Sequence, residues 1–449
     1  MDKVFRYIDD HAEEFVERLR NLLHQPSVAA QSLGMEPCAQ KVRAMLEGIG
    51  AKTQLLPTDG FPVVYGELSG QGAKTLSFYN HYDVQPAEPF ELWQSDPWAA
   101  EIRDGKLYAR GASDNKGDLT ARICALEAYQ KVMGALPLNL KFIIEGEEEI
   151  GSPSLGKFAE QNRKLIQADA CVWEFGGKDL ADRPTISLGL KGICYVELRV
   201  KSTIADAHSS IAAIVPNAAW RLTWALSTLK DKNEKVLIKG FYGKVRTPHK
   251  KEVDALRSLG FDEAGNKKKY GIKHFVKKLK GTALLRKLYY EPTCTICGIS
   301  SGYSGTGPKT VLPAEAMAKI DFRLVPDQSP AETVKLLKAH LKKHGFDDLE
   351  VIPLNGEHPA RTPIDEPLAQ IVAKTAQQIY EKKPVVQPTS PASGPMYMLC
   401  QKFGIPAVST GIGYAHSNGH APNENIRVND FIAGIKHIAM VVHEYGQRA

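Results

Sequence analysis

The sequence lacks several features that would assign it to a particular class of protein. It contains no run of about 18 apolar residues, so we expect no membrane span, and its first ten residues contain no apolar core of a secretory signal. The net charge is only +6, from 57 Lys and Arg against 51 Asp and Glu, which is too small to indicate nucleic-acid binding by itself. Internal repeats and low-complexity tracts are also missing. With 43% apolar and 24% charged residues, the composition is typical of a soluble globular protein.

Cysteine is scarce, and its spacing does not indicate a set of disulfide bonds. The seven cysteines are an odd number, scattered in apolar surroundings, which favours reduced thiols and a cytoplasmic location. Cys294 and Cys297 form a CxxC pair, but no second pair exists that would complete a structural zinc site. We interpret the two as strand cysteines that point the same way, or nearly so.

What the sequence does contain is alternation of strand-like and helix-like segments. A chain of 449 residues is long enough for two or three domains. Apolar runs at 76–80, 138–145 and 170–175 predict strands, and the apolar periodicity at 118–133 predicts a helix between them. Residues 2–24 are predicted to form an amphipathic helix. Strands that alternate with helices indicate an α/β domain, in which functional side chains lie at the ends of strands.

The pattern changes near residue 194. Residues 195–201 and 316–324 alternate apolar and polar side chains, which predicts strands with one exposed face. The helical segments nearby are 218–229 and 331–344. After residue 357 the chain resumes with predicted elements at 368–380, 407–411 and 430–445. We therefore expect a first domain made of residues 1–194 together with 358–449, and an inserted smaller α+β domain at 195–357.

Potential metal ligands follow the predicted strands of the first domain. They are His81 and Asp83, Asp114, the triplet Glu147-Glu148-Glu149, Glu174 and the distant His420. Imidazole and carboxylate ligands without thiolate suit zinc, manganese or cobalt. Two histidines and several carboxylates exceed the needs of one ion and suffice for two metals that share a bridging carboxylate. These residues predict a metallohydrolase.

Four segments give a more specific indication. In order along the chain they are 80–86 (NHYDVQP), 107–117 (LYARGASDNKG), 145–152 (EGEEEIGS) and 420–424 (HAPNE). With these segments the chain resembles the M20 family of metallopeptidases, particularly its dipeptidase-like branch, essentially from end to end. The resemblance implies a catalytic domain whose mixed sheet is flanked by helices, of the zinc exopeptidase type. It also implies that the inserted α+β domain serves as a lid and as a homodimer interface.

The resemblance assigns the metal ligands. His81 and Glu174 would bind one divalent ion, Glu149 and His420 would bind the second, and Asp114 would bridge both. Zinc is the expected metal, with manganese and cobalt as alternatives.

Two carboxylates beside the ligands receive catalytic roles from the same resemblance. Asp83 would hold the imidazole of His81 through its other ring nitrogen. Glu148 would act as the general base, taking a proton from the attacking water and passing it to the leaving amine. The neighbouring Glu147 is interpreted as a solvated carboxylate. The family pattern also implies a cis peptide bond between Asp114 and Asn115.

The inserted domain contributes candidate substrate residues. His208 matches a family histidine that reaches the active site of the partner subunit and stabilises the oxyanion. Arg323 matches the arginine that binds the substrate carboxylate, a geometry that suits a guanidinium. Thr310, Ser393 and Gly394 match positions that contact substrate.

The predicted activity is hydrolysis of the peptide bond in dipeptides, or similar short substrates with a free C-terminal carboxylate. Glu174 leaves an alternative open, because the corresponding ligand is often Asp in dipeptidases of the family and Glu in acylases, desuccinylases and carboxypeptidases. A remote alternative is nucleic-acid binding by residues 266–287, which contain nine Lys and Arg and no Asp or Glu. We expect no nucleic-acid or membrane partner. No role is predicted for that basic stretch or for His416.

Overall fold

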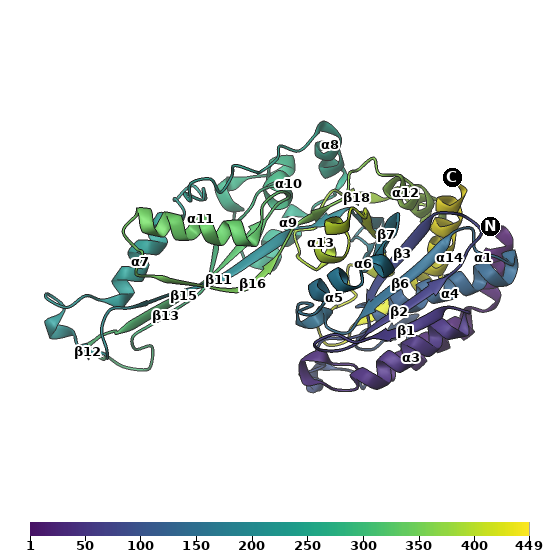
Figure 1. The fold of residues 1–449 in the computed structure, drawn as a ribbon, viewed down its shortest axis with the longest axis horizontal. Helices are drawn as coiled ribbons and strands as arrows, with labels where there is room; N and C mark the ends of the chain where they lie inside the picture. Colours follow the sequence, from purple (N-terminus) through teal and green to yellow (C-terminus); the bar gives the residue numbers. More distant parts are fainter. Residues whose placement is uncertain (449) are drawn as a thin grey trace. The chain divides into compact units, whose positions relative to one another are not determined.

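The computed structural model describes residues 1–448, which form two units (Figure 1). Unit 1 contains residues 1–189, 361–389 and 395–448, and unit 2 contains Leu190–Ala360 together with Ser390–Gly394. Each unit buries its own cluster of apolar side chains. The chain thus begins in unit 1, builds unit 2 and returns to complete unit 1. No helix in the described chain is both long and apolar enough to cross a membrane.

Unit 1 is built on a ten-stranded mixed sheet, so the predicted fold class is confirmed. Its strand order is β1-β2-β6-β3-β7-β19-β9-β8-β20, and β18 pairs with β9. The strands span Lys52–Leu56 (β1), Val63–Leu68 (β2), Thr75–His81 (β3), Asn139–Glu145 (β6), Ala170–Trp173 (β7), Gly177–Lys178 (β8), Pro184–Ser187 (β9), Val385–Gln387 (β18), Ala407–Ser409 (β19) and Gly413–Tyr414 (β20).

The central strands β6, β3 and β7 run parallel to one another. Their side chains are buried almost throughout, which explains why the sequence shows continuous apolar runs there and no alternation. Register pairs His81 with Glu145, the last residues of β3 and β6. The carboxyl ends of these strands therefore meet at one edge of the sheet.

Helices flank this sheet. They span Asp2–Asp10 (α1), Ala12–Leu23 (α2), Met35–Gly48 (α3), Lys116–Met133 (α4), Leu155–Gln161 (α5), Arg163–Ile166 (α6), Pro367–Tyr380 (α12), Met396–Leu399 (α13) and Val428–Gln447 (α14). Helix α3 packs against β1 and β2, and α4 packs against β3 and α14. The single helix expected at 2–24 is divided at His11, whose backbone leaves the helical region.

A small three-stranded sheet brings two distant loops of unit 1 together. It has the order β21-β5-β4, formed by Asn425–Arg427, Lys106–Tyr108 and Glu101–Arg103. Because β21 pairs with β5, the loop that precedes Asn425 lies beside the loop that follows Tyr108. The first of these loops carries His420 and the second carries Asp114.

Unit 2 has a four-stranded antiparallel sheet of order β13-β15-β11-β16, formed by Thr295–Ser301, Glu315–Leu324, Gly192–Lys201 and Glu350–Glu357. The residues of β15 alternate between buried and exposed or half-buried, so one face packs and the other is open. Helices α7 (Ala218–Leu229) and α11 (Pro330–Lys343) cover the packed face. The one-sided sheet predicted from the alternation of residues is therefore present.

The other elements of unit 2 are the helices Lys250–Ser258 (α8), Glu263–Tyr270 (α9) and Gly281–Tyr290 (α10), and the strands Ala207–His208 (β12) and Val311–Leu312 (β14). The interpretation of the CxxC pair is wrong in one respect. Cys294, directly before β13, is buried and Cys297, within β13, is exposed, because side chains three residues apart in extended chain point to opposite faces. The two thiols do not face the same way.

Candidate metal centre

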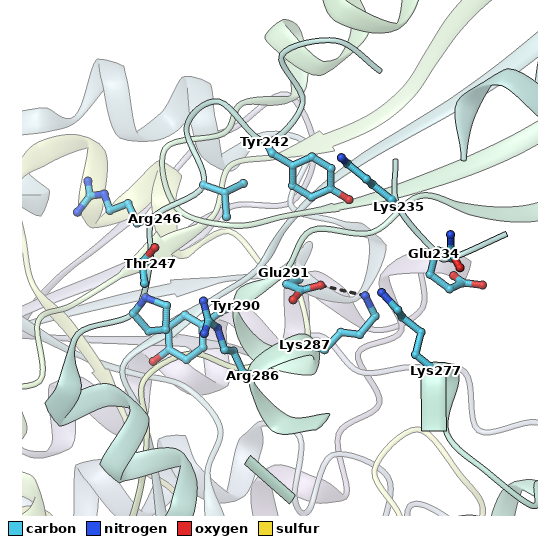
Figure 2. Close-up of a pocket in the computed structure, with 13 residues that line it drawn as sticks. Glu234, Lys235, Tyr242, Arg246, Thr247, Lys277, Arg286, Lys287, Tyr290 and Glu291 are labelled. Carbon is cyan, nitrogen blue, oxygen red and sulfur yellow. Dashed lines mark hydrogen bonds and ion pairs between the residues drawn. The ribbon is translucent and has the colours of Figure 1, made fainter. Parts of the chain in front are cut away.

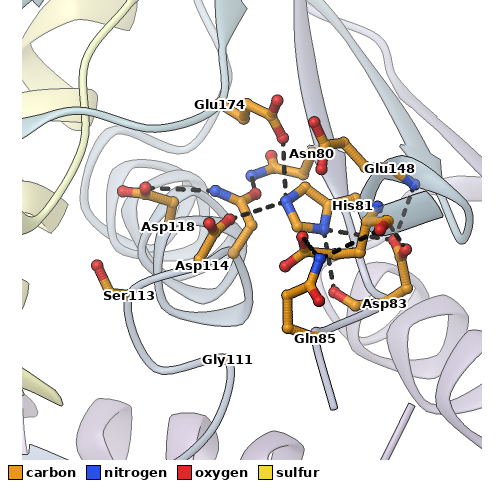
Figure 3. Close-up of polar contacts among 12 residues, drawn as sticks. Asn80, His81, Asp83, Gln85, Gly111, Ser113, Asp114, Asp118, Glu148 and Glu174 are labelled. Carbon is orange, nitrogen blue, oxygen red and sulfur yellow. Dashed lines mark hydrogen bonds and ion pairs between the residues drawn. The ribbon is translucent and has the colours of Figure 1, made fainter. Parts of the chain in front are cut away.

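The candidate ligands of unit 1 lie where neighbouring strands end (Figure 3). His81 is the last residue of β3, and Glu174 directly follows β7. Glu148 and Glu149 lie in a single helical turn shortly after β6. Because these strands are parallel neighbours, residues far apart in the sequence converge at the same edge of the sheet.

Asp114 lies between the two histidines. Its Oδ1 is 3.0 Å from His81 Nε2, and its Oδ2 is 3.1 Å from His420 Nε2. Each histidine also faces a glutamate: His81 Nε2 is 3.2 Å from Glu174 Oε2, and His420 Nε2 is 3.2 Å from Glu149 Oε2. The five residues thus form two donor sets, each with one imidazole nitrogen and two carboxylate oxygens, joined through the two oxygens of Asp114.

The geometry around His81 identifies which ring nitrogen faces the cluster. His81 Nδ1 is 3.0 Å from the backbone carbonyl of Asp83 and 3.4 Å from its carboxylate, and both groups accept hydrogen bonds. Nδ1 therefore carries hydrogen, and Nε2 is the nitrogen available to a metal. The carboxylate of Asp83 also accepts the backbone N–H groups of Glu148 (3.3 Å) and Glu149 (2.9 Å), which ties it to the turn that carries both glutamates.

The donor set fits divalent cations. Buried Glu149 Oε1 has no hydrogen-bond partner in the described chain, and the only printed contact of buried Glu174 Oε2 is the ion pair with His81 Nε2. A buried carboxylate oxygen without a partner is unfavourable unless a cation compensates it. Donor atoms of His81, Asp114 and Glu149 lie within 4.8 Å of one another, a separation that permits shared coordination.

Proton affinities in the metal-free centre show how strongly it attracts positive charge. Hydrogen bonds to Asp114 and Glu149 raise the pKa of His420 to about 10. Burial lowers the pKa of His81, but Glu174 and the two aspartates outweigh that effect and hold it well above its usual value. Burial and the nearby Glu148 raise the pKa of Glu174. In the absence of metal, protons therefore neutralise part of this charge.

Glu148 differs from its neighbours because its carboxylate makes no hydrogen bond or ion pair within residues 1–448. Burial, together with the charges of Glu149 and Asp114, raises its pKa to about 8 despite the opposing effect of His81. A carboxylate with raised proton affinity that is not held by other groups is suited to accept and release a proton.

The loop that carries Asp114 is held by a residue to which the sequence assigned no role. Glu424 accepts backbone N–H groups from Gly111 (3.0 Å), Ser113 (2.8 Å) and Asp114 (3.0 Å), and forms a fully buried ion pair with Arg110 at 2.6 Å. The only signal in the sequence was that Glu424 follows His420 within one motif. The peptide bond between Asp114 and Asn115 is cis, as the resemblance implied.

Arg122 of α4 is a second residue that sequence reasoning missed. Its buried guanidinium donates to the carbonyls of Tyr79 (2.6 Å), at the end of β3, and Trp173 (2.6 Å), at the end of β7. It also donates to the side chain of Asn80 at 2.7 Å. Arg122 therefore links the strand ends that position His81 and Glu174. No sequence signal marks it, because an arginine on an amphipathic helix normally lies on the exposed face.

The interpretation of Glu147 as a solvated carboxylate is wrong. Its side chain is buried and accepts the backbone N–H groups of Phe61 and Ser154, both at 3.2 Å. Glu147 therefore stabilises the loops around the turn. The sequence around Glu147 shows only three consecutive acidic residues. Its hydrogen bonds are to distant loops, and such bonds leave no local sequence pattern.

In unit 2 the candidate residues form two pairs. Arg323 on β15 donates to Ser393 Oγ at 2.9 Å and to Asp321 at 3.1 Å, with Gly394 next to Ser393. Thr310 Oγ1 is 3.1 Å from His208 Nε2.

The exposed His416 packs its ring edge-on against Tyr414 and belongs to neither donor set.

The tautomer of His208 follows from its surroundings. The backbone N–H of Ser210 donates to His208 Nδ1 at 3.1 Å, so this nitrogen is an acceptor. The neutral ring therefore carries its hydrogen on Nε2, which donates to Thr310. An exposed N–H held in this way can also donate to an oxyanion.

Comparison with known proteins agrees with this geometry. The model of peptidase family M20/M25/M40 matches residues 77–444. The chain is 29% identical to mouse Beta-Ala-His dipeptidase over 97% of its length and 94% of that protein. It is 28% identical to the Cys-Gly metallodipeptidase dug1 of Schizosaccharomyces pombe, over 99% of its length and 98% of that protein.

Solved structures show the same architecture. The M20 family metallo-carboxypeptidase Sso-CP2 of Sulfolobus solfataricus matches with a TM-score of 0.90 and 40% identity, over 97% of this chain and 99% of that one. Human carnosine dipeptidase 1 matches with a TM-score of 0.73 and 28% identity, over 99% of both chains. The chain therefore belongs to peptidase family M20/M25/M40, which confirms the family predicted from its motifs.

Proposed function

We propose that the protein hydrolyses the peptide bond of dipeptides, or of similarly short substrates with a free C-terminal carboxylate, at a centre of two divalent metal ions. The observation that carries this proposal is the position of Asp114, whose two oxygens face two histidines that are each paired with a glutamate. The curated relatives named above are dipeptidases, and the chain aligns with nearly all of their length. Zinc is the proposed metal, because its preferred ligands include nitrogen and carboxylate oxygen.

Each residue of the centre has a proposed task. His81 and Glu174 would hold one ion, Glu149 and His420 would hold the other, and Asp114 would offer one carboxylate oxygen to each. When bound, the two ions would supply Lewis acidity, which lowers the pKa of water and polarises a carbonyl.

Glu148 takes the proton from the attacking water and delivers it to the leaving amine. Asp83 keeps His81 in the tautomer that leaves Nε2 free, and it holds the backbone of the turn on which Glu148 lies.

Unit 2 supplies recognition in this proposal. Arg323, oriented by Asp321 and Ser393, binds the terminal carboxylate of the substrate. A guanidinium matches a carboxylate through two parallel hydrogen bonds. At Gly394 an added Cβ atom would approach Leu190 Cδ1 to 3.1 Å, so glycine fits this position next to Ser393 without displacing Leu190. His208 donates its Nε2–H to the developing oxyanion, and Thr310 holds the ring until the substrate arrives.

We further propose that the protein is a homodimer that pairs through unit 2 and that His208 acts in the site of the partner. Trp220 and Trp224 of α7 stack on each other and are 58% and 53% exposed. The edge strand β13 exposes Ile296 and Ile299. Exposed aromatic and aliphatic side chains of this kind mark interaction surfaces, and an edge strand can pair with its own copy across a two-fold axis. The scattered cysteines support a cytoplasmic location.

A second candidate is a carboxypeptidase or an N-acyl-amino-acid deacylase of the same family. Two observations favour it. The ligand at position 174 is Glu, and the chain is 40% identical to a protein described as an M20 family metallo-carboxypeptidase. Both candidates require the same metal centre and the same carboxylate contact, and they differ in what lies on the amino side of the cleaved bond.

A hydrolysis panel distinguishes these functions. Free dipeptides, longer free peptides, C-terminally amidated dipeptides, and N-acetyl and N-succinyl amino acids are each offered to the protein with zinc, manganese or cobalt. The proposal expects free dipeptides to have the highest kcat/KM, and amidated dipeptides to be poor substrates. Higher kcat/KM for longer peptides would establish the carboxypeptidase, and higher kcat/KM for acylated amino acids would establish the deacylase. A panel without turnover, with the protein shown to hold metal, would contradict both.

A further inference from the structure

Unit 2 contains a pocket that the proposed chemistry does not use. It has a volume of about 370 Å³ and lies between α10, the turn at 233–235 and the segment at 242–248 (Figure 2). All of its lining residues belong to unit 2. The volume falls in the usual range for pockets that bind small molecules, about 300–1,000 Å³.

Positive charge dominates the lining. Five cationic side chains line the pocket, and they are Lys235, Arg246, Lys277, Arg286 and Lys287. The two acidic lining residues are already engaged: Glu291 pairs with Lys287 at 2.9 Å, and Glu234 pairs with Lys230, which lies outside the lining, at 2.5 Å. Arg246 pairs with Asp327. Lys235, Lys277 and Arg286 form no ion pair at contact distance within the described residues 1–448, although the nearby carboxylate of Asp231 attracts both lysines.

The basic stretch at 266–287 does not explain this convergence. Only Lys277, Arg286 and Lys287 of that stretch line the pocket, whereas Lys235 and Arg246 come from earlier segments. Three separate parts of the chain therefore place cations around one concavity, although like charges repel. A solvated basic surface would be spread along one element and would need no concavity.

The floor of the pocket is preorganised. Tyr290 is only 4% exposed, and the carbonyl of the next residue, Glu291, accepts a hydrogen bond from the buried Lys191 at 2.6 Å. The wall at Tyr242 is also fixed, since its hydroxyl accepts the backbone N–H of Val236 at 3.0 Å. The backbone around the pocket is therefore held, and only the exposed cationic side chains have to be ordered when a ligand binds.

We propose that this pocket binds a small anion with two phosphate groups, of about the size of a sugar bisphosphate. A dianionic phosphate attracts several cations at once, and the guanidinium of Arg286 can bind two of its oxygens together. Two phosphates match a lining of five cations and two carboxylates, both already paired, better than one carboxylate does. The site is separate in sequence from every candidate ligand of the metal centre, and it does not depend on the proposed function.

Calorimetric titration of the full-length, metal-loaded protein with fructose 1,6-bisphosphate tests the proposal. The pocket variant is Lys277→Gln with Arg286→Gln. The control variant, Lys268→Gln with Lys269→Gln, removes the same charge from α9 in the same basic stretch but outside the pocket lining. Dipeptide hydrolysis and circular dichroism report whether both variants remain folded.

We expect one bisphosphate per chain in the wild type, with inorganic phosphate competing more weakly. The Kd should rise about tenfold or more in the pocket variant, because two charge-assisted contacts are lost, and it should change less than about twofold in the control. Equal bisphosphate affinity in the wild type and the pocket variant would overturn the proposal. That result is also expected if the phosphate groups bind at the metal centre and not in the pocket. The proposal would also be overturned if the bisphosphate did not bind. Binding of a short single-stranded oligonucleotide that the control variant weakens would then assign the basic stretch to nucleic acid.

Discussion

The two units carry functional side chains of different character. Three donor side chains of unit 1 are buried near strand ends, with His81, Glu174 and Glu149 only 1%, 6% and 4% exposed, whereas Asp114 and His420 lie on loops and are 32% and 54% exposed. None of the candidate residues of unit 2 has a comparably buried, crowded charge: His208 lies on the surface, and Arg323 is 34% exposed and already bound to other side chains. Buried, crowded charges need a fixed cation, whereas exposed groups can exchange one partner for another. We infer that unit 1 performs the chemistry and that unit 2 recognises the substrate.

The largest effect is expected in unit 1 at Glu148. Glu148→Gln removes the proton acceptor and should lower kcat by about 10²–10⁴-fold or more, while both metals remain bound. Glu149→Gln should instead reduce the bound metal, measured by atomic absorption after dialysis. If the first variant lost metal and the second kept it, the two roles would belong to the opposite residues of the turn.

The next largest effect is expected in unit 2 at Arg323. Arg323→Ala removes a charge-assisted contact of about 1.5–3 kcal/mol, which corresponds to a loss of about tenfold to somewhat over a hundredfold in kcat/KM for a free dipeptide. Metal content should not change. Lys319→Ala, on the same half-buried face of β15, is the matched control and should have little effect.

Amidated dipeptides sharpen this prediction, because they lack the carboxylate that Arg323 is proposed to bind. They should be poor substrates of the wild type, and Arg323→Ala should lower their kcat/KM only slightly further. Equal kcat/KM for free and amidated dipeptides in the wild type would make the carboxylate contact wrong.

The pH dependence of metal binding tests the charge of the unit 1 cluster. Because the pKa of His420 is about 10 without metal, and that of His81 is also raised, both rings are protonated at neutral pH and must release protons when metals bind. Affinity should therefore increase as pH rises between 6 and 8, by up to about tenfold per pH unit for each proton released. Calorimetry in buffers of different ionisation enthalpy measures the release. Metal affinity that is constant over this range would contradict the prediction.

The smallest expected signal concerns exchange between subunits. His208→Ala keeps an intact metal centre, and Glu148→Gln keeps an intact His208. If His208 acts in the partner site, equal mixing with free exchange should restore about a quarter of wild-type activity, because half the dimers are mixed and each has one complete site. Verified mixed dimers without activity would place His208 in its own subunit's site or outside catalysis.

Much of the fold could be predicted from the sequence because its patterns are local. The apolar runs at 76–80 and 138–145 match β3 and β6 within about one residue, and the alternation at 316–324 matches β15. The family was predicted from short motifs and is confirmed. The roles of the ligands in catalysis remain predictions, although the structure places their donor atoms together.

What the sequence did not show depends on long-range contacts. Glu424 holds a loop more than 300 residues away, and Arg122 joins strand ends from a helix, so neither leaves a periodic signal. The burial of Glu147 has the same cause. Ser390–Gly394 lies with unit 2 although its neighbours in sequence belong to unit 1, because Ser393 pairs with Arg323.

The central claim is that Asp114 bridges two metal ions, and anomalous diffraction from zinc-loaded crystals tests it most directly. We predict two zinc peaks, about 3.5–4 Å apart, with one oxygen of Asp114 on each. One ion should contact His81 and Glu174, and the other should contact His420 and Glu149. A single zinc ion at full occupancy, or two ions with Asp114 bound to only one of them, would contradict the account.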